Sequence, residues 1–268
     1  MMNQEMIVLP KKPRSNSLKK TLFYIITISL FVWSLDSVNY IGVMGTAAAT
    51  FKAMMKGLIT PDWAYLKDLS VDGLPYAVVE TVTIAISGTF VSAILAIPIA
   101  LIASQNIVGA KFSKIGKYII TMIRTFPEII LALIFIGIVG PGAPAGILAL
   151  GVHSIGMLGK LFSESIESMD AGVKEAVESC GGNKMEVLFR AIIPQVSAEF
   201  ISYTLFRFET NMRAASTLGV VGAGGFGAPL IFAIIALQWS RTFTIVIVLI
   251  VTVTLIDLLS GSIRKKLV

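Results

Sequence analysis

Long apolar runs separated by short polar segments dominate this chain of 268 residues. A helix needs about 20 apolar residues to cross the roughly 30 Å hydrocarbon core of a bilayer. We therefore predict an all-α, polytopic membrane protein, with a short N-terminal segment at 1–19 and a transmembrane domain at 20–268. The six predicted transmembrane helices lie near residues 20–42, 76–104, 117–140, 145–162, 195–215 and 235–260.

The composition supports this prediction. Hydrophobic residues make up 55% of the chain and charged residues only 14%, whereas a soluble domain carries about 25% charged residues. The net charge of +6 does not indicate nucleic-acid binding, because the basic residues fall where a membrane topology places them. Cys180 is the single cysteine, which excludes an intrachain disulfide and a cysteine-based metal site.

Lysine and arginine residues also predict the orientation. With the N-terminus inside, sixteen of them lie in cytoplasmic segments and five in outer segments, which satisfies the positive-inside rule. Both termini are therefore expected in the cytoplasm. The basic run at 11–20 and the apolar run at 21–35 also resemble a signal peptide, with a possible cleavage site at 47–49. The distance to that site is long, so we favour an uncleaved first span.

A charged segment at 163–194 interrupts the apolar pattern between the fourth and fifth predicted spans. Ser163 and Asp170 are candidate helix N-caps, and the glycines at 181–182 end one helix before a second resumes at Lys184. We predict a helix–turn–helix along the membrane surface. A solvated loop without a partner is the simpler alternative.

The spacing in this segment resembles the cytoplasmic coupling loop of ABC-importer permeases. That pattern is Glu-Ala-Ala, three residues, Gly, nine residues, then Ile-x-Leu-Pro, and the glycine and proline spacings match in full. The departures are Val177, Ala191 and Ile193. The resemblance implies that this segment docks an ATPase through Glu175, Ala176, Glu178, Gly181 and Gly182.

The chain lacks a nucleotide site of its own. No G-x-x-x-x-G-K-[ST] motif occurs in the sequence, so ATP and Mg²⁺ are expected on a separate ATPase chain, and no cofactor is expected here. The run 222–227 reads G-x-G-x-x-G, but no strand precedes it and Ile247 stands where the acidic residue belongs. We interpret these glycines as tight helix packing or irregular backbone at a cavity.

The fifth predicted span is unusually polar. Four of its side chains fall within about 80° of one another at 100° per residue, and they are Glu199, Ser202, Glu209 and Arg213. One interpretation is a substrate pathway in which Arg207 and Arg213 attract an anion. The other is an i,i+4 pair between Glu209 and Arg213 that neutralises itself.

The fourth predicted span carries His153 and Ser154, which allow the same two interpretations. They either line the substrate pathway or form a hydrogen bond between helices. The second is the more common role of a lone histidine in a span.

Four further motifs resemble the phosphonate-type branch of these permeases. They are Arg124-Thr-Phe-Pro-Glu128, His153 with 156–162, Tyr203 to Glu209, and Leu218 to Gly225. The resemblance implies a homodimeric pore in the bacterial cytoplasmic (inner) membrane, two copies of an ATPase, an extracytoplasmic solute-binding protein and a phosphorus oxyanion or organophosphonate substrate.

Three alternatives remain at this point. A permease for another small solute, such as methionine or a quaternary amine, fits the same coupling loop. An intramembrane enzyme needs a paired set of catalytic side chains, and Glu199, Glu209 and His153 are too scattered in the pattern to form one. A channel or structural subunit needs no coupling loop. We therefore expect a transport subunit and not an enzyme.

Overall fold

The computed structural model describes residues 17–37 and 43–266. The chain divides into two compact units, Met1–Lys52 and Ala53–Val268. The first contains α1 (Ser17–Asp36) and the beginning of α2 (Val43–Ile59). Apolar side chains are exposed along α1, as expected of a helix surrounded by lipid. The predicted N-terminal segment lies mostly outside the described residues.

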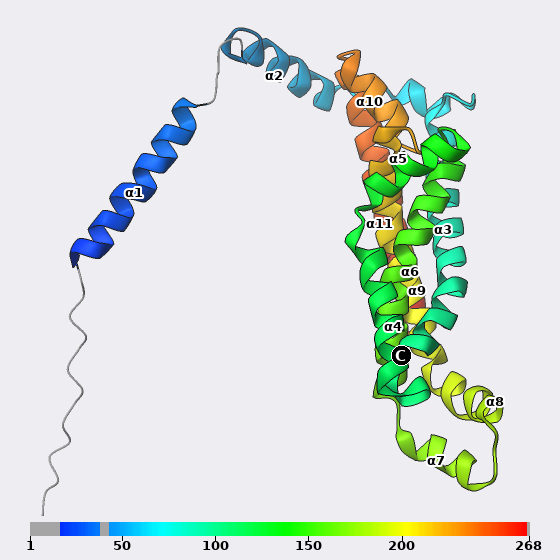
Figure 1. Ribbon diagram of the computed structural model, residues 1–268. Helices are drawn as coiled ribbons and strands as arrows, with labels where there is room; N and C mark the ends of the chain where they lie inside the picture. The colour runs from blue at the N-terminus through cyan, green and yellow to red at the C-terminus, as the bar shows by residue number, and fades with distance from the viewer. Residues whose placement is uncertain (1–16, 38–42, 267–268) are drawn as a thin grey trace, which may run out of the picture. The chain divides into compact units, whose positions relative to one another are not determined.

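The second unit is a bundle in which long helices run side by side (Figure 1). No strand occurs in either described range, which confirms the all-α prediction. The elements after α2 are η1 (Trp63–Lys67), α3 (Leu74–Ala103), α4 (Gln105–Thr125), α5 (Glu128–Val139), α6 (Ala143–Ser168), α7 (Ala171–Ser179), α8 (Lys184–Val187), η2 (Leu188–Ile192), α9 (Ile193–Leu218), η3 (Gly219–Val221), α10 (Gly227–Ile235) and α11 (Trp239–Arg264).

Among the described residues, three helices are long and apolar enough to cross a membrane, namely α3, α6 and α11. The pair α4 and α5 meets the same test together, but the two helices are bent by 82°. The sequence predicts one span at 117–140 with a kink or helix start at Pro127, and the structure has two helices there. Pro127 explains the break, because a proline disfavours helical backbone at the residue before it, and Phe126 is extended. The count of six spans stays a prediction.

The charged segment begins later than the sequence predicts. Ser163 is not an N-cap, because α6 continues to Ser168 and the Ser163 hydroxyl donates to the Lys160 carbonyl at 2.8 Å. The cap at Asp170 is confirmed, since its side chain accepts from the Gly172 N–H at 2.9 Å. Asn183 caps the second helix. The helix–turn–helix prediction is thus confirmed for 171–192.

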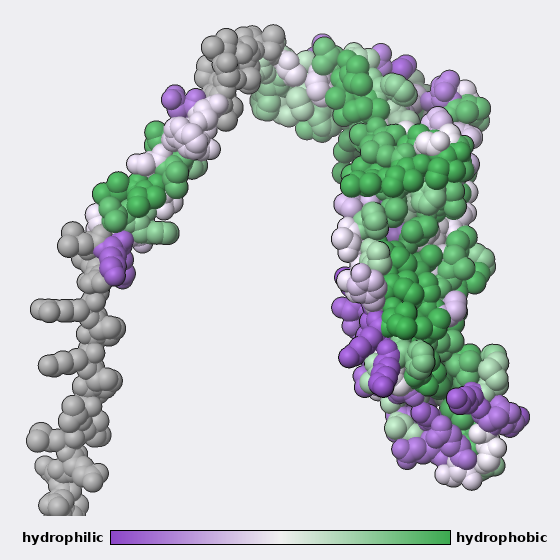
Figure 2. Space-filling view, in the orientation of Figure 1, coloured by the Kyte–Doolittle hydropathy of each residue, from purple (hydrophilic) through white to green (hydrophobic). Residues whose placement is uncertain are grey.

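Opposite ends of the bundle are built differently. We call residues 219–227 the glycine loop; this loop and the helices α7 and α8 lie at opposite ends (Figure 1). Figure 2 shows apolar surface along the bundle and hydrophilic side chains gathered over α7 and α8. The charged-segment end is therefore polar outside, while its interior holds a cluster of apolar side chains.

Candidate functional site

The helices of the charged segment expose the residues predicted to dock a partner. Glu175, Ala176, Glu178 and Gly181 are all exposed. Gly181 has φ +83°, and a Cβ added there would meet nothing within 4 Å. These residues form an open surface that a second protein can approach.

Gly182 has a different position. It is half-buried, and a Cβ at this residue would lie 2.8 Å from the Val177 carbonyl oxygen. A real side chain does not approach backbone so closely, so the close approach of α7 requires glycine here. Met185 of α8 and Phe189 of the turn that follows it are apolar and also exposed.

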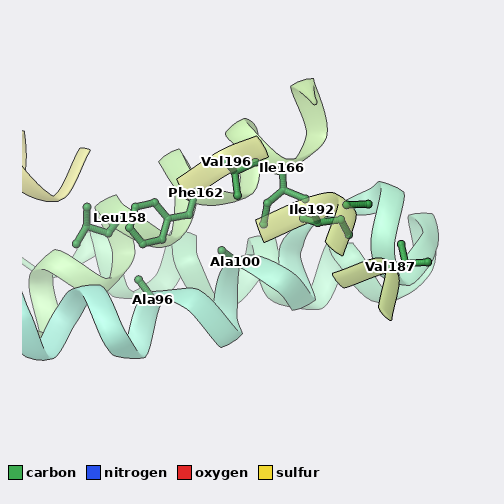
Figure 3. Close-up of a cluster of buried hydrophobic side chains, with 9 residues drawn as sticks. Ala96, Ala100, Leu158, Phe162, Ile166, Val187, Ile192 and Val196 are labelled. Atoms are coloured by element: carbon green, nitrogen blue, oxygen red, sulfur yellow. The ribbon is translucent and has the colours of Figure 1, made fainter. Parts of the chain in front are cut away.

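Buried apolar side chains join the charged segment to the bundle. Figure 3 shows the nine-residue cluster that they form with α3, α6 and α9. Its members are Ala96, Ala100, Leu158, Phe162, Ile166, Val187, Ala191, Ile192 and Val196. Residues 188–192 form a π-helical turn that runs directly into α9, and such turns often occur at functional sites. The cluster thus packs α8 and residues 188–192 against three long helices.

A second attachment ties α7 to the turn between α3 and α4. The Lys174 ammonium donates to the Asn106 carbonyl at 2.9 Å and lies 3.9 Å from the Glu178 carboxylate. The Asn106 amide in turn donates to the Ile166 carbonyl at 2.6 Å. The charged segment therefore contacts the bundle through apolar packing and through polar groups.

A buried polar network links α3, α6 and α9. Asn211 donates to the Thr89 hydroxyl at 2.8 Å and contacts the Ser154 hydroxyl at 3.0 Å. The Arg207 Nε donates to the same Ser154 oxygen at 2.8 Å. Arg207 is 3% exposed, and among the described residues its Nη2 has no hydrogen-bond partner. A buried cation with an unused donor is costly in an apolar setting, which makes Arg207 a candidate functional residue.

His153 lies beside this network. It precedes Ser154 on α6, about one turn before Gly156, where the α6 backbone packs against Arg124 at the end of α4. Its Nδ1 is buried and has no hydrogen-bond partner in the described ranges. The bend between α4 and α5 therefore meets α6 and α9 at one polar centre, which we define as Arg207, His153, Ser154 and Asn211.

The acidic stripe predicted on α9 does not assemble into one site. Glu209 pairs with Arg264 of α11 at 2.9 Å and not with Arg213. Arg213 is exposed and lies 3.7 Å from Asp257. The predicted pair between Glu209 and Arg213 is therefore wrong, because α11 packs along α9 and supplies a partner for each side chain.

The other two members of the stripe are separate again. Glu199 is exposed and accepts a hydrogen bond from the Ser165 hydroxyl. Ser202 is half-buried. Only Arg207, His153 and Ser154 of the predicted pathway residues are brought together.

The glycine loop closes the opposite end by backbone contacts. Gly222, Gly224 and Gly225 have φ of +93°, +86° and +78°, a region that glycine enters without steric cost. The Gly225 N–H donates to the Glu80 carboxylate at 2.8 Å, and the Phe226 N–H donates to the Thr81 hydroxyl at 2.9 Å. The prediction of irregular backbone is confirmed here.

A cavity of about 440 Å³ opens beside the glycine loop. Tyr65, Glu80, Gly225 and Arg241 are among its lining residues. The Arg241 guanidinium lies 5.3 Å from the centre of the Tyr65 ring. Burial raises the pKa of the Tyr65 phenol, and the charge of Arg241 opposes that rise. Tyr65, Glu80 and Arg241 therefore place polar groups in the cavity beside the glycine loop.

Residues 96–268 match the family described as the binding-protein-dependent transport system inner membrane component. The match covers more than half of the chain. This chain belongs to that family of transport permeases. It is accordingly a transport subunit and not an enzyme.

Two relatives of this permease are named for the transport of phosphite or phosphate. It is 36% identical over 188 residues to a phosphite transport system permease protein of Stutzerimonas stutzeri, which covers 70% of this chain and 68% of the relative. It is 38% identical over 190 residues to a phosphate-import permease protein of Mycolicibacterium smegmatis, which covers 70% of this chain and 36% of the relative.

A solved structure shares the fold of this permease. An inward-facing form of the MetNI methionine ABC transporter superposes with a TM-score of 0.63 at 20% identity. The superposition covers 73% of this chain and 96% of the other. At this identity the likeness concerns the fold alone.

Sequence reasoning missed three residues of these sites. Asn211 belongs to the polar centre, Thr89 accepts a hydrogen bond from it, and Glu80 holds the glycine loop. Asn211 lies two residues beyond Glu209 on the same polar helix, so its amide side chain in an apolar span was the sequence feature that could have predicted it. The partners of Thr89 and Glu80 are more than a hundred residues away in sequence.

Proposed function

We propose that this permease carries a phosphorus oxyanion, such as phosphite, phosphate or a phosphonate, inward across the bacterial cytoplasmic membrane. The supporting observation is the polar centre, where a buried arginine keeps a free donor. A guanidinium offers planar donors that match phosphate-like oxygens, and such charge-assisted bonds strengthen in a low dielectric. The names of the two relatives support the same substrate class.

We further propose that a separate ATPase drives transport. Two copies of the ATPase, holding ATP and Mg²⁺, would dock on two copies of this permease, and an extracytoplasmic solute-binding protein would deliver the substrate. The open surface around Glu175, Ala176, Glu178 and Gly181 supports this docking. Met185 and Phe189 are exposed beside these residues, and methionine and aromatic side chains are enriched in surfaces that are covered in a complex.

The substrate proposal is tested by uptake into proteoliposomes. The permease is reconstituted with its ATPase and binding protein, ATP is placed inside, and uptake of labelled phosphite, phosphate and methylphosphonate is measured. We expect uptake of at least one, and Arg207→Gln should lower it by about a hundredfold, because a buried charge that contacts the substrate is removed. Arg213→Gln is the matched control, since Arg213 is exposed on the same helix.

Two results would reject different parts of the proposal, the substrate class and the role of Arg207. Uptake of methionine or a quaternary amine in place of every phosphorus compound would replace the substrate class. Uptake that is equal in the parent and in Arg207→Gln would leave the substrate class intact and make Arg207 structural.

The orientation is proposed from the positive-inside bias. Both termini, α7 and α8 would face the cytoplasm, and the glycine loop would face outside. In a Cys180→Ser background, an impermeant thiol reagent added from outside should label a cysteine at position 56 and leave one at position 265 unlabelled. The reverse pattern would invert the topology.

A further inference from the structure

A second cavity, of about 290 Å³, lies between α4 and α6 on the charged-segment side of the polar centre. Its lining includes three cationic side chains, Lys117, Arg124 and Lys160. The hydroxyls of Thr121 and Ser163 also line it, but each already donates to a carbonyl of its own helix at 2.8 Å. The cations are therefore the donors available to a ligand.

The acids in the cavity neutralise two of the three cations. Lys117 lies 2.8 Å from Glu167, and Lys160 lies 3.4 Å from Glu164. Arg124 has no ion pair among the residues that the structure describes. The cavity thus keeps one uncompensated guanidinium, with two ammonium groups close by that can turn toward an added anion. Exposure of these side chains favours weak binding and fast release.

Arg124 connects this cavity to the polar centre. A Cβ added at Gly156 of α6 would lie 2.7 Å from Arg124 Cγ, so the arginine packs directly on the α6 backbone. Gly156 lies three residues after His153 on α6, so Arg124 packs within about one helical turn of the polar centre. Lys117 stands seven residues before Arg124 on α4, roughly 10 Å nearer the proposed cytoplasmic end at 1.5 Å per residue.

We propose that this cavity is a cytoplasm-facing site for the phosphorus oxyanion after it leaves the polar centre. The proposal rests on the proposed function, because it takes the substrate to be a phosphorus oxyanion. An anion that leaves Arg207 meets a second guanidinium at Arg124 and then ammonium groups near the aqueous end. The same site binds the oxyanion from the cytoplasm, so a high internal concentration slows further import.

The test uses proteoliposomes with ATP inside and the binding protein outside. The initial rate of labelled phosphite uptake is measured as unlabelled phosphite inside the vesicles is increased. We expect internal phosphite to inhibit uptake by the parent complex. Arg124→Gln should raise the inhibitory concentration about tenfold, because one charge-assisted contact is lost. Arg124→Lys should retain part of the inhibition.

Lys114→Gln is the matched control. Lys114 is exposed on the same helix and does not line the cavity, so this variant should be inhibited like the parent. ATPase activity and detergent-solubilised yield are measured for every variant, so that a folding defect is recognised. If Arg124→Gln assembles poorly, Lys160→Gln replaces it and should shift the inhibitory concentration in the same direction.

The outcomes separate the two proposals. A parent complex that imports no phosphorus oxyanion overturns both the proposed function and this site. A parent that imports phosphite while Arg124→Gln, Lys160→Gln and Lys114→Gln are all inhibited equally overturns the site alone. The assay is repeated in phosphatidylcholine vesicles with and without phosphatidylglycerol. An Arg124 effect that follows phosphatidylglycerol and not internal phosphite assigns the cavity to a lipid headgroup, and this too overturns the site.

Discussion

The two ends of the bundle are held together by different kinds of contact. At the glycine loop, backbone packs on backbone: a Cβ at Gly219 would lie 2.4 Å from the Gly224 carbonyl oxygen. At the charged segment, apolar side chains fill the interior, and Gly181 faces open space. The first end therefore tolerates almost no added volume, whereas the second leaves a surface free and connects it to the long helices. A closure by backbone packing and an attachment by side-chain packing have different sequence requirements.

The largest effect should follow from Gly219→Val. The new side chain would also overlap Gly227, whose backbone N lies 2.6 Å from the added Cβ. Backbone on both sides cannot move away without opening the loop, so we expect a loss of at least about 3 kcal/mol and little assembled permease. The yield and melting temperature of the detergent-solubilised protein measure this.

Gly181→Ala is the control at the other end. The φ of +83° makes alanine unfavourable there, but no atom blocks the Cβ. The expected cost is about 1 kcal/mol. Equal losses at Gly219 and Gly181 would show that the two ends do not differ in tolerance.

Gly181→Trp tests the function of the charged-segment end. A large side chain on the open surface should destabilise the fold about as much as alanine does at the same φ, and it should also obstruct the proposed ATPase contact. We expect transport per ATP hydrolysed to fall by more than about tenfold, because packing against a partner is prevented over a central part of the surface. Membrane insertion and melting temperature serve as controls. Parent-like transport would remove the docking assignment.

The sequence predicted the charged segment well because its information is contiguous. The cap at Asp170, the break at 181–182 and the resumption of helix at Lys184 all lie within about 15 residues, and helix capping depends on neighbours in sequence. The one local error, at Ser163, arose because a serine is also accommodated inside a helix when its hydroxyl bonds to an earlier carbonyl.

The polar centre was only partly predictable. Helical periodicity placed Glu209 and Arg213 on one face correctly, but a face does not identify its partner, and α11 supplied Arg264 and Asp257. Similarly, Pro127 predicted a bend or a helix start, while the angle of 82° depends on the packing of α5 against α6 and α9. Contacts between distant helices are tertiary information, which a single sequence does not carry.

Removing one hydrogen bond at the glycine loop should have an intermediate effect. Glu80→Ala leaves the Gly225 N–H without its acceptor, and an unpaired buried donor costs about 1–3 kcal/mol. Glu80→Gln keeps a neutral acceptor, and neutral hydrogen bonds are roughly half as strong as charged ones. The melting temperatures should therefore rank parent, Glu80→Gln, Glu80→Ala. A glutamine variant as unstable as the alanine variant would mean that the charge, not the loop contact, is what stabilises this end.

The smallest effect should come from the corresponding bond at the other end. Lys174 donates to the Asn106 carbonyl, but its side chain is 28% exposed, so water can replace the bond when it is lost. Lys174→Met keeps the apolar stem and should cost at most about 1 kcal/mol, in the range of exposed ion pairs. The shift in melting temperature relative to Glu80→Ala measures the difference between the ends directly. Transport should persist, because the nine-residue cluster still holds α8 and α9. If Lys174 also fixes the angle of α7, less substrate should be transported per ATP hydrolysed. A destabilisation as large as that of Glu80→Ala would show that polar contacts hold the charged segment as firmly as the glycine loop. The contrast between an end closed by backbone contacts and an end attached by apolar side chains would then no longer stand.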